Sequence, residues 1–176
     1  FMRLLYATRP YELQAGAAEA VHQKWKKICQ ESLSKRSIPL FEFGKNVKGI
    51  IRDFDNIPLS SEEKPKVGIV GEILVKFSPL ANNHIVELLE KEGAEAVMPD
   101  LMDFLLYCFY NQNFKHENLG ASWKGKTLCN IAIALLESFR KTAKKELQKS
   151  KHFTAPSDIR ELASLAREYV SLGNKT

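Results

Sequence analysis

The sequence predicts an α/β domain with a Rossmann-like three-layer architecture, built from a short parallel sheet and several long helices. Residues 66–72 (KVGIVGE) form an apolar run that enters a glycine turn, which is typical of a buried parallel strand. Residues 94–98 form a second short strand. Between the two runs we expect a loop of about ten residues with Ser78 and Pro79, followed by a helix that Asn82 or Asn83 caps and Gly93 ends. Strand, helix and strand within about 33 residues indicate a βαβ unit, whose crossover we expect to be right-handed.

Helical periodicity accounts for most of the remaining chain. Residues 13–33 place apolar side chains at helical spacing, with lysines between them. Asp100 caps a predicted helix that is apolar nearly all round, and we expect this helix to be buried on several sides. A long helix is predicted from Thr127, with an apolar stripe made of Leu128, Ile131, Leu135, Phe139 and Leu147. The last predicted helix begins at Pro156, carries inward-facing residues as far as Val170 and ends at Gly173.

Two segments lack such periodicity. Residues 37–60 contain two prolines and two glycines, which predicts a long irregular connection with room for one short helix near Ile50. Residues 111–126 are polar and are predicted to form a loop. We therefore expect residues 1–60 to supply the N-terminal helix and the irregular connection. Residues 61–176 then supply the βαβ unit and the C-terminal helices, and the whole forms one compact domain.

We also expect the chain to be a piece of a larger protein. Phe1 precedes Met2, so the chain does not start where translation starts. Only two strands emerge, whereas a doubly wound sheet normally has about four or more. Either this chain contains further strands that the pattern does not reveal, or the rest of the sheet lies beyond Thr176 in other domains of the same polypeptide.

Composition and charge narrow the classes of function. Hydrophobic residues make up 44% and charged residues 27% of the 176 residues, which is ordinary for a globular protein. No apolar run approaches the roughly 18 residues of a membrane span. The net charge is +5, and the basic residues gather in residues 24–36 and 140–151, which we interpret as solvated helix faces. Neither a membrane nor a nucleic acid is therefore an expected partner.

Cysteine and histidine patterns predict no metal site. Cys29, Cys108 and Cys129 are widely spaced, which favours a reducing cytoplasm over a disulfide framework. Each lies on an apolar helical stripe, so we expect core packing and not iron–sulfur ligation. The four histidines are far apart. A phosphate-binding glycine loop is absent as well, since Gly68 and Gly71 lack a third partner.

The candidate site consists of Glu72, Asn82 and Asn83. Ligands of open α/β sheets bind beyond the carboxyl ends of the strands, which is where Glu72 follows the first strand. Asn82 and Asn83 lie at the predicted N-terminus of the next helix, where free N–H groups favour an anion. In the competing interpretation the asparagines only cap the helix, and Glu72 either pairs with Lys76 or itself caps that helix.

Several motifs resemble one family. They are KVGIVGEI at residues 66–73, ANN at 81–83, EGAE at 92–95 with Pro99, FLLYCFYN at 104–111 and TRPYE at 8–12. This series is similar to the dehydratase-like region of the large CoA-substrate-specific enzyme activases, relatives of the 2-hydroxyacyl-CoA dehydratase activators. The resemblance covers most of the chain.

The resemblance implies a context for the chain. Full-length members carry ATPase domains, and some hold a [4Fe–4S] cluster, so ATP and the cluster would be bound elsewhere in the parent protein. The implied partners are other domains of the same polypeptide and a 2-hydroxyacyl-CoA dehydratase-like protein. The predicted function is accessory and non-catalytic. The alternative is a small-ligand or nucleotide-binding domain with its own pocket at the end of the first strand.

Overall fold

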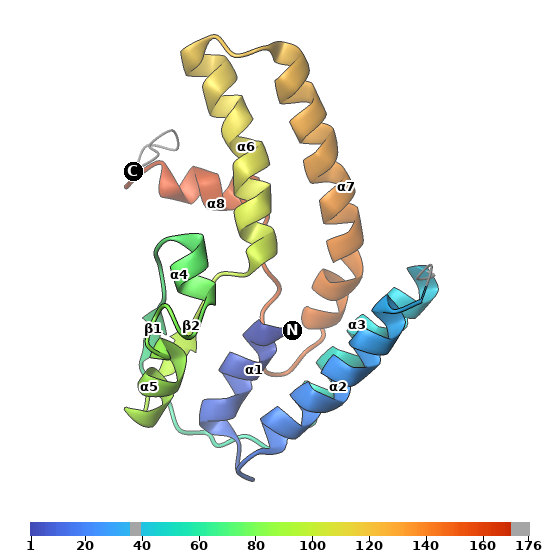
Figure 1. Cartoon of the computed structure of the whole chain (residues 1–176), viewed down its shortest axis with the longest axis vertical. Coiled ribbons are helices and arrows are strands. Elements are labelled where there is room, and N and C mark those ends of the chain that lie inside the picture. Colours follow the sequence, from blue (N-terminus) through green and yellow to red (C-terminus); the bar gives the residue numbers. More distant parts are fainter. Residues whose placement is uncertain (36–39, 170–176) are drawn as a thin grey trace. The chain divides into compact units, whose positions relative to one another are not determined.

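The computed structural model describes residues 1–35 and 40–169 and is mostly helical (Figure 1). Its internal contacts divide the chain into two compact units. The first comprises Phe1–Pro99 and Glu146–Thr154, and the second comprises Asp100–Lys145 and Ala155–Thr176. The predicted helix end at Gly173 and the inward-facing Val170 lie outside the described residues.

Within the described residues 1–35 and 40–99, the first unit contains six helical segments and two strands. They are, in chain order, α1 (Met2–Thr8), the 3₁₀ turn η1 (Arg9–Tyr11), α2 (Ala17–Leu33), α3 (Leu40–Asp55), β1 (Lys66–Gly68), α4 (Ile73–Phe77), α5 (Ile85–Lys91) and β2 (Glu95–Val97).

The two strands pair in parallel, and α4 and α5 lie between them in sequence, which confirms the βαβ unit. Val67 lies opposite Ala96, and the pairing continues to a hydrogen bond of 2.8 Å from the N–H of Ile69 to the carbonyl of Val97. Each strand has three residues and is shorter than the predicted run. A helical chain with a short parallel sheet is compatible with the α/β class.

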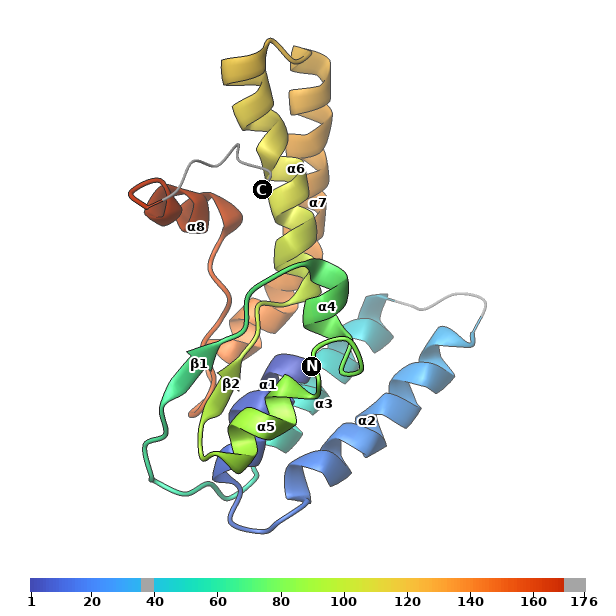
Figure 2. The ribbon, with the colours of Figure 1, turned by 60° about the vertical axis from the view of Figure 1, so that its left-hand side comes forward.

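The two strands differ in their exposure. In β2, Glu95 and Ala96 are buried, because α1 and α5 pack against this strand (Figure 2). All three residues of β1 are exposed, and β1 forms the outer edge of the pair. The expectation that residues 66–72 form a buried strand is therefore wrong; within this run only Ile69 is buried.

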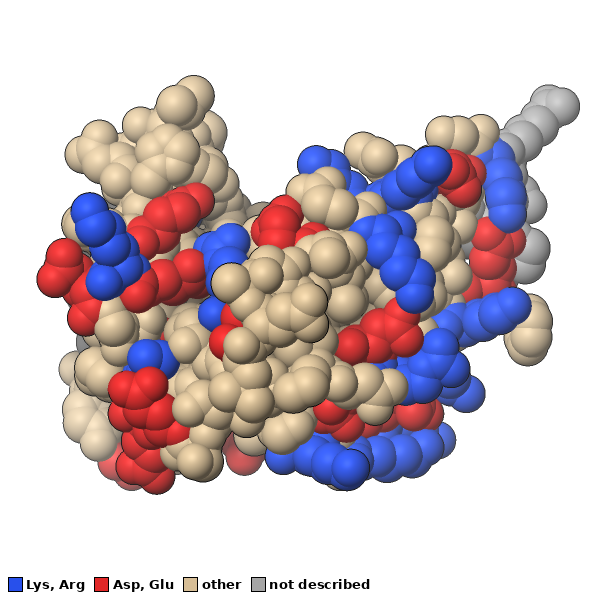
Figure 3. Space-filling model, turned by 90° about the horizontal axis from the view of Figure 1, so that it is seen from below, with Lys and Arg blue, Asp and Glu red and all other residues tan. Residues whose placement is uncertain are grey.

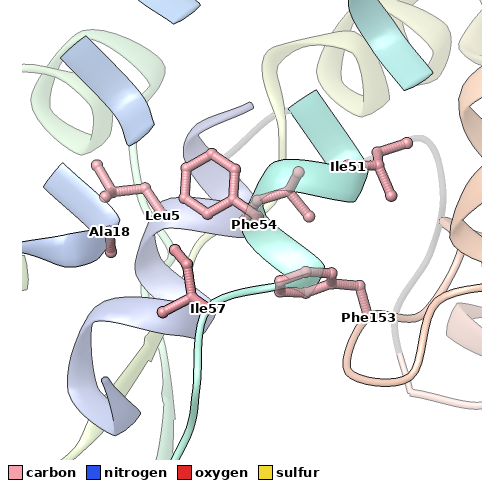
Figure 4. Close-up of a cluster of buried hydrophobic side chains, with 7 residues drawn as sticks. Leu5, Ala18, Ile51, Phe54, Ile57 and Phe153 are labelled. Atoms are coloured by element: carbon pink, nitrogen blue, oxygen red, sulfur yellow. The ribbon is translucent and has the colours of Figure 1, made fainter. Parts of the chain in front are cut away.

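The core of the first unit consists of two clusters. In the larger one, Leu5 of α1 and Phe54 of α3 meet Ala18 of α2, with Phe153 also contributing (Figure 4). The smaller cluster lies under the sheet and is made of Ile69, Val86, Ala96 and Met98. Tyr6 of α1 packs against both clusters. Helix α1 thus connects the helical part of the unit with the sheet.

Helix α3 corrects the prediction that residues 37–60 are irregular. Its apolar residues Ile51 and Phe54 face the larger cluster, and that burial outweighs the roughly 1 kcal/mol that each glycine costs a helix. Gly49 lies against the indole of Trp25 on α2, and a methyl group at this position would overlap the ring. The glycine that suggested a loop is therefore the residue that lets two helices approach.

We predict that Gly49→Ala destabilises the first unit. The added methyl overlaps the buried Trp25 ring, and overpacking of this kind costs about 1–3 kcal/mol. Gly125→Ala on α7 is the matched control, because its methyl would meet nothing and should gain up to about 1 kcal/mol in helix propensity. Thermal unfolding followed by circular dichroism measures both, and equal melting temperatures for the two variants would contradict the packing argument.

The carboxylate of Asp53 connects α3 to α2. Asp53 of α3 accepts hydrogen bonds from the Lys24 ammonium at 2.7 Å and from the Trp25 indole N–H at 3.0 Å. Burial by itself would raise the pKa of the Asp53 carboxyl, but these two donors hold it below its ordinary value. The ionised form therefore stabilises the fold above pH ~4, and this contribution disappears as the pH falls through the lowered pKa.

Asp53→Asn should consequently flatten the acid side of the stability profile. In the native chain we expect the free energy of unfolding to fall below pH ~4 more steeply than in the variant. Urea unfolding at several pH values measures the difference. Glu63→Gln, at an exposed carboxylate, should keep the native profile, and identical profiles for all three proteins would show that Asp53 contributes nothing.

The second unit contains three helices within its described part. They are α6 (Leu101–Leu119), α7 (Trp123–Leu147), whose last two residues belong to the first unit, and α8 (Ile159–Ala166). Asp100 caps α6 as predicted, with its carboxylate accepting from the N–H of Asp103 at 2.8 Å. Leu106, Ile133 and Ile159 form the core, one from each helix.

The predicted loop at residues 111–126 is wrong. Helix α6 continues to Leu119, and only residues 120–122 connect it to α7, with Gly120 in the left-handed region at φ 67°. The polar residues stay helical because they bond across the helix pair: Asn113 and Asn130 exchange amide hydrogen bonds of 3.4 and 3.0 Å. Buried Arg140 of α7 likewise binds Asp103 at 2.8 Å and Glu137 at 3.0 Å.

Helix α6 is less buried than its composition suggested. Leu106 and Asn111 are its buried residues, whereas Leu101, Leu105 and Cys108 are exposed. The expectation of a helix buried on several sides, with Cys108 in the core, is therefore wrong. Among the helices of the described residues, none has the combined length and apolar character that crossing a membrane requires.

Candidate functional site

Glu72 lies directly before α4, a short helix inside the segment that was predicted as a loop. Its carboxylate accepts hydrogen bonds from the backbone N–H groups of Leu74 at 2.7 Å and Val75 at 3.1 Å. Gly71 precedes it at φ 139°, a conformation that favours glycine and turns the chain from β1 into the helix. Glu72 thus satisfies the free donors at the start of α4.

Asn82 joins the end of α4 to the start of α5. Its side-chain N–H donates to the carbonyl of Lys76 at 3.0 Å, and its oxygen accepts from the N–H of Ile85 at 3.3 Å. Asn83 and His84 follow in the left-handed region, at φ 55° and 54°. Asn tolerates this conformation better than most residues, which explains its presence at the turn.

The three predicted residues therefore occupy one turn-rich segment, but Glu72 and Asn82 bond to opposite ends of α4. Asn82 caps α5, as the competing interpretation expected, and Glu72 caps α4, a helix that neither interpretation included. Helices α4 and α5 have five and seven residues, too few for a strong anion site at either N-terminus. A ligand-binding role for Glu72, Asn82 and Asn83 stays a prediction.

A second polar cluster lies where η1 meets α5 and β2. The Arg9 guanidinium donates to the Glu90 carboxylate at 2.7 Å, and both side chains are largely shielded from solvent. The Tyr11 hydroxyl donates to buried Glu95 at 2.8 Å, and Lys66 of β1 reaches the same carboxylate at 3.4 Å. These contacts attach the N-terminal segment to the βαβ unit.

This cluster was missed in the sequence, although its residues belong to two of the quoted motifs. Arg9 and Tyr11 lie in TRPYE, and Glu95 ends EGAE. The other polar residues of TRPYE, Thr8 and Glu12, form hydrogen bonds to backbone groups. Thr8 is buried and donates to the carbonyl of Leu4 at 2.7 Å, while Glu12 accepts from the N–H groups of Gly16 at 2.6 Å and Ala18 at 2.7 Å. The sequence signal for this cluster was the presence of charged residues, Arg9 and Glu95, beside apolar residues in two short segments.

Burial shapes the proton affinities of the cluster. It raises the pKa of the Glu90 carboxyl, and the nearby Arg9 guanidinium counteracts this effect only in part. Burial and the hydrogen bond to Glu95 raise the pKa of Tyr11 to about 12, so its hydroxyl stays a donor at neutral pH. One oxygen of Glu90 is buried and has no hydrogen-bond partner. Shifted pKa values mark catalytic sites and structural ion pairs alike. Here the hydrogen bonds of Arg9 and Tyr11 each join two segments of the fold.

The three cysteines differ in their exposure. Cys108 is exposed, whereas Cys29 and Cys129 are half-buried, and all three are free thiols. Burial raises the pKa of the Cys29 thiol, which makes it a poor nucleophile at neutral pH. Within the part of the chain that the structure describes, no group of three or more His, Cys, Asp or Glu side chains is arranged to hold a metal ion.

Comparison of the chain with protein families, with characterised proteins and with solved structures found no significant match.

We predict that Arg9→Met destabilises the first unit by about 1–3 kcal/mol, because it leaves the shielded Glu90 carboxylate without its donor. The double variant Arg9→Met/Glu90→Leu should recover part of this loss, since it removes the unpaired charge as well. Urea unfolding of the two single variants and the double variant gives the coupling free energy. Additive effects would contradict a direct pair.

The same variant should have a distinctive pH dependence. A carboxyl whose folded pKa is raised takes up protons more readily when folded, so stability rises as the pH falls through that pKa. Without Arg9 the pKa of Glu90 should rise further, and Arg9→Met should regain stability on mild acidification. The double variant lacks the carboxyl and serves as the control.

Proposed function

We propose that this chain is an accessory, non-catalytic α/β region of an ATP-dependent protein related to the activators of 2-hydroxyacyl-CoA dehydratases. In this proposal its two strands belong to a larger Rossmann-like three-layer sheet, to which other domains of the same polypeptide contribute. The protein acts in the cytoplasm on a 2-hydroxyacyl-CoA dehydratase-like partner, and ATP and any [4Fe–4S] cluster are held outside this chain. The motif series from TRPYE to FLLYCFYN supports the family.

In this accessory role the chain docks other protein surfaces instead of catalysing a reaction. The observation that carries the docking role is the exposure of strand β1. Parallel strands are normally covered on both faces, because the helices that connect them pack on the two faces of the sheet. In this chain β2 is covered by α1 and α5, whereas β1 is exposed along its whole length. An uncovered strand edge offers unpaired backbone donors and acceptors to a further strand.

Apolar side chains continue this surface beyond the end of β1. Val70, Leu74 and Leu80 have exposed fractions of 83%, 74% and 86%. Val75 and Phe77 of α4 are exposed as well. Several large apolar side chains within eleven residues are unusual on a surface that faces only water, and such groups mark contact sites. We call Val70, Leu74, Val75, Phe77 and Leu80 the α4 surface.

The distribution of charge agrees with a protein partner more than with a nucleic acid. On the face shown in Figure 3, basic and acidic side chains are interspersed. Lys24 of α2 pairs with Asp53 at 2.7 Å, and Lys35, just past the end of that helix, pairs with Glu42 at 2.6 Å. A nucleic-acid surface needs basic residues free to contact phosphates.

We predict that Leu74→Asp/Leu80→Asp in the intact polypeptide impairs ATP-dependent dehydration of a 2-hydroxyacyl-CoA by its dehydratase. A loss of about tenfold corresponds to about 1.4 kcal/mol of docking free energy. Both positions are exposed, so the melting temperature of this chain alone should barely change. Leu13→Asp, at another exposed leucine outside the α4 surface, is the control and should retain full activity.

Two failures of this experiment have different meanings. If the native polypeptide, purified without oxygen, neither hydrolyses ATP nor supports any dehydration, the family proposal is wrong. If the native protein is active and the double variant is equally active, the family stands and the docking role of the α4 surface is refuted.

A further inference from the structure

Strand β1 uses one of its two edges to bind β2. The N–H of Glu95 donates to the carbonyl of Pro65 at 2.9 Å, and the N–H of Ile69 donates to the carbonyl of Val97 at 2.8 Å. Both bonds join odd-numbered residues of the segment 65–70 to β2. Because the backbone groups of successive strand residues point to opposite edges, the even-numbered residues of this segment present theirs to the other side.

These even-numbered residues are Lys66, Gly68 and Val70. In the described part of the chain, no hydrogen bond reaches the backbone N–H or carbonyl of any of them. All three residues are exposed. Their donors and acceptors repeat at about 6.6 Å, which is twice the rise of one strand residue. Another extended chain matches this spacing, whereas a helix does not, because its backbone groups are bonded within the helix.

The far edge of β2 is closed, so the sheet can grow only beyond β1. In the two ribbon views β2 lies between β1 and α1, and α1 packs against β2 (Figures 1 and 2). Ala96, the middle residue of β2, is 2% exposed. The N–H of Ala94, directly before β2, already donates to the carbonyl of Leu89 in α5 at 2.9 Å. A strand that joins this sheet therefore binds to β1.

The side chains beside the free edge indicate an apolar strand. Ile69 lies in the smaller core cluster, whereas Val67, on the same face, is 37% exposed. On the opposite face Val70 is 83% exposed, and Lys66 already pairs with Glu95 at 3.4 Å. The edge thus offers apolar contacts on both faces, and strands inside a parallel sheet are apolar on both faces as well.

A second copy of the chain fits this edge less well than a strand of the same polypeptide. Two copies related by a twofold axis would pair β1 with itself over residues 66–70, a length of about 17 Å. Interfaces between separate chains bury about 1,200–2,000 Å², of which such a short strand pair supplies only a small part. A tethered strand needs less contact, because its linker keeps it at a high effective concentration.

We propose that a further strand of the same polypeptide, apolar on both faces, binds the outer edge of β1 through the backbone of Lys66, Gly68 and Val70. Strand β2 then ends the sheet. Other domains of the polypeptide supply the added strand, so this site rests on the proposed function. The hydrogen bonds fix the register of the added strand, and its apolar side chains cover Val67 and Val70.

Amide hydrogen exchange, followed by NMR, tests the proposal residue by residue. In the 176-residue chain alone, the amides of Lys66, Gly68 and Val70 should exchange freely, whereas the amide of Ile69, which is bonded to β2, should be protected. In the intact polypeptide the exchange of the three outward amides should slow at least about tenfold. The amide of Ile69 is the internal control, because it is bonded in both proteins.

Two substitutions at Gly68 show whether the backbone makes the contact. Gly68→Pro removes the outward N–H, and an edge strand tolerates proline where that N–H faces solvent. Gly68→Ala keeps the N–H, and its methyl would meet nothing within 4 Å, so it is the matched control. In the intact polypeptide, proline should abolish the protection of Lys66 and Val70, whereas alanine should retain it. Protection of the Ile69 amide checks that β1 still pairs with β2 in both variants.

Three results would overturn the proposal. Free exchange of Lys66, Gly68 and Val70 in the intact polypeptide would show that no strand covers the edge, and this comparison needs no variant. Protection of these amides in the 176-residue chain that disappears on dilution would assign the edge to a second copy. Equal protection in the proline and alanine variants would show that the hydrogen bonds of the edge are not used.

The same measurements separate this site from the family. Protection of the edge in a polypeptide that neither hydrolyses ATP nor supports dehydration would refute the family and leave the added strand in place. An active polypeptide whose edge amides exchange freely would keep the family and refute the added strand.

Discussion

Strand β2 is buried because α1 and α5 pack against it, and the first unit depends on this contact. Two paired strands of three residues cannot exclude water by themselves, so a parallel pair needs helices on its faces. Helix α1 provides this cover and also places Leu5 beside Phe54 in the larger cluster. Because Tyr6 packs against both clusters, the α2–α3 pair and the sheet share one support.

The polar contacts near η1 follow from the same arrangement. Packing α1 on β2 brings Arg9 and Tyr11 against Glu90 and Glu95. Without Arg9 the shielded Glu90 carboxylate would lose its donor. Each charged side chain is therefore matched by a group from the other segment, and the pairing fixes how the N-terminal turn meets the βαβ unit. A cluster of this kind favours one packing arrangement over others more than it adds stability.

The sequence predicted those elements whose local signals agree with their surroundings. Asp100 marked the start of α6, and the βαβ unit followed from two apolar runs with a helix between them. The errors occurred where a distant partner decides. Gly49 breaks helical patterns in sequence, yet Trp25 requires it in α3, and Asn113 suggested a loop although Asn130 on α7 satisfies its amide. At the candidate site, the capping role of Asn82 was foreseen, while α4 was missed because its five residues carry too short a period to recognise.

Helix α7 shows a limit to what hydrophobic periodicity can predict. A stripe at helical spacing shows that one face of a helix avoids water, but not which neighbour covers it. Helix α7 is apolar on two sides, so Ile133 satisfies the core of its own unit and Ile131, two residues away, is left facing outward. Burying Ile131 and its neighbours requires a second surface, which helical spacing by itself does not identify.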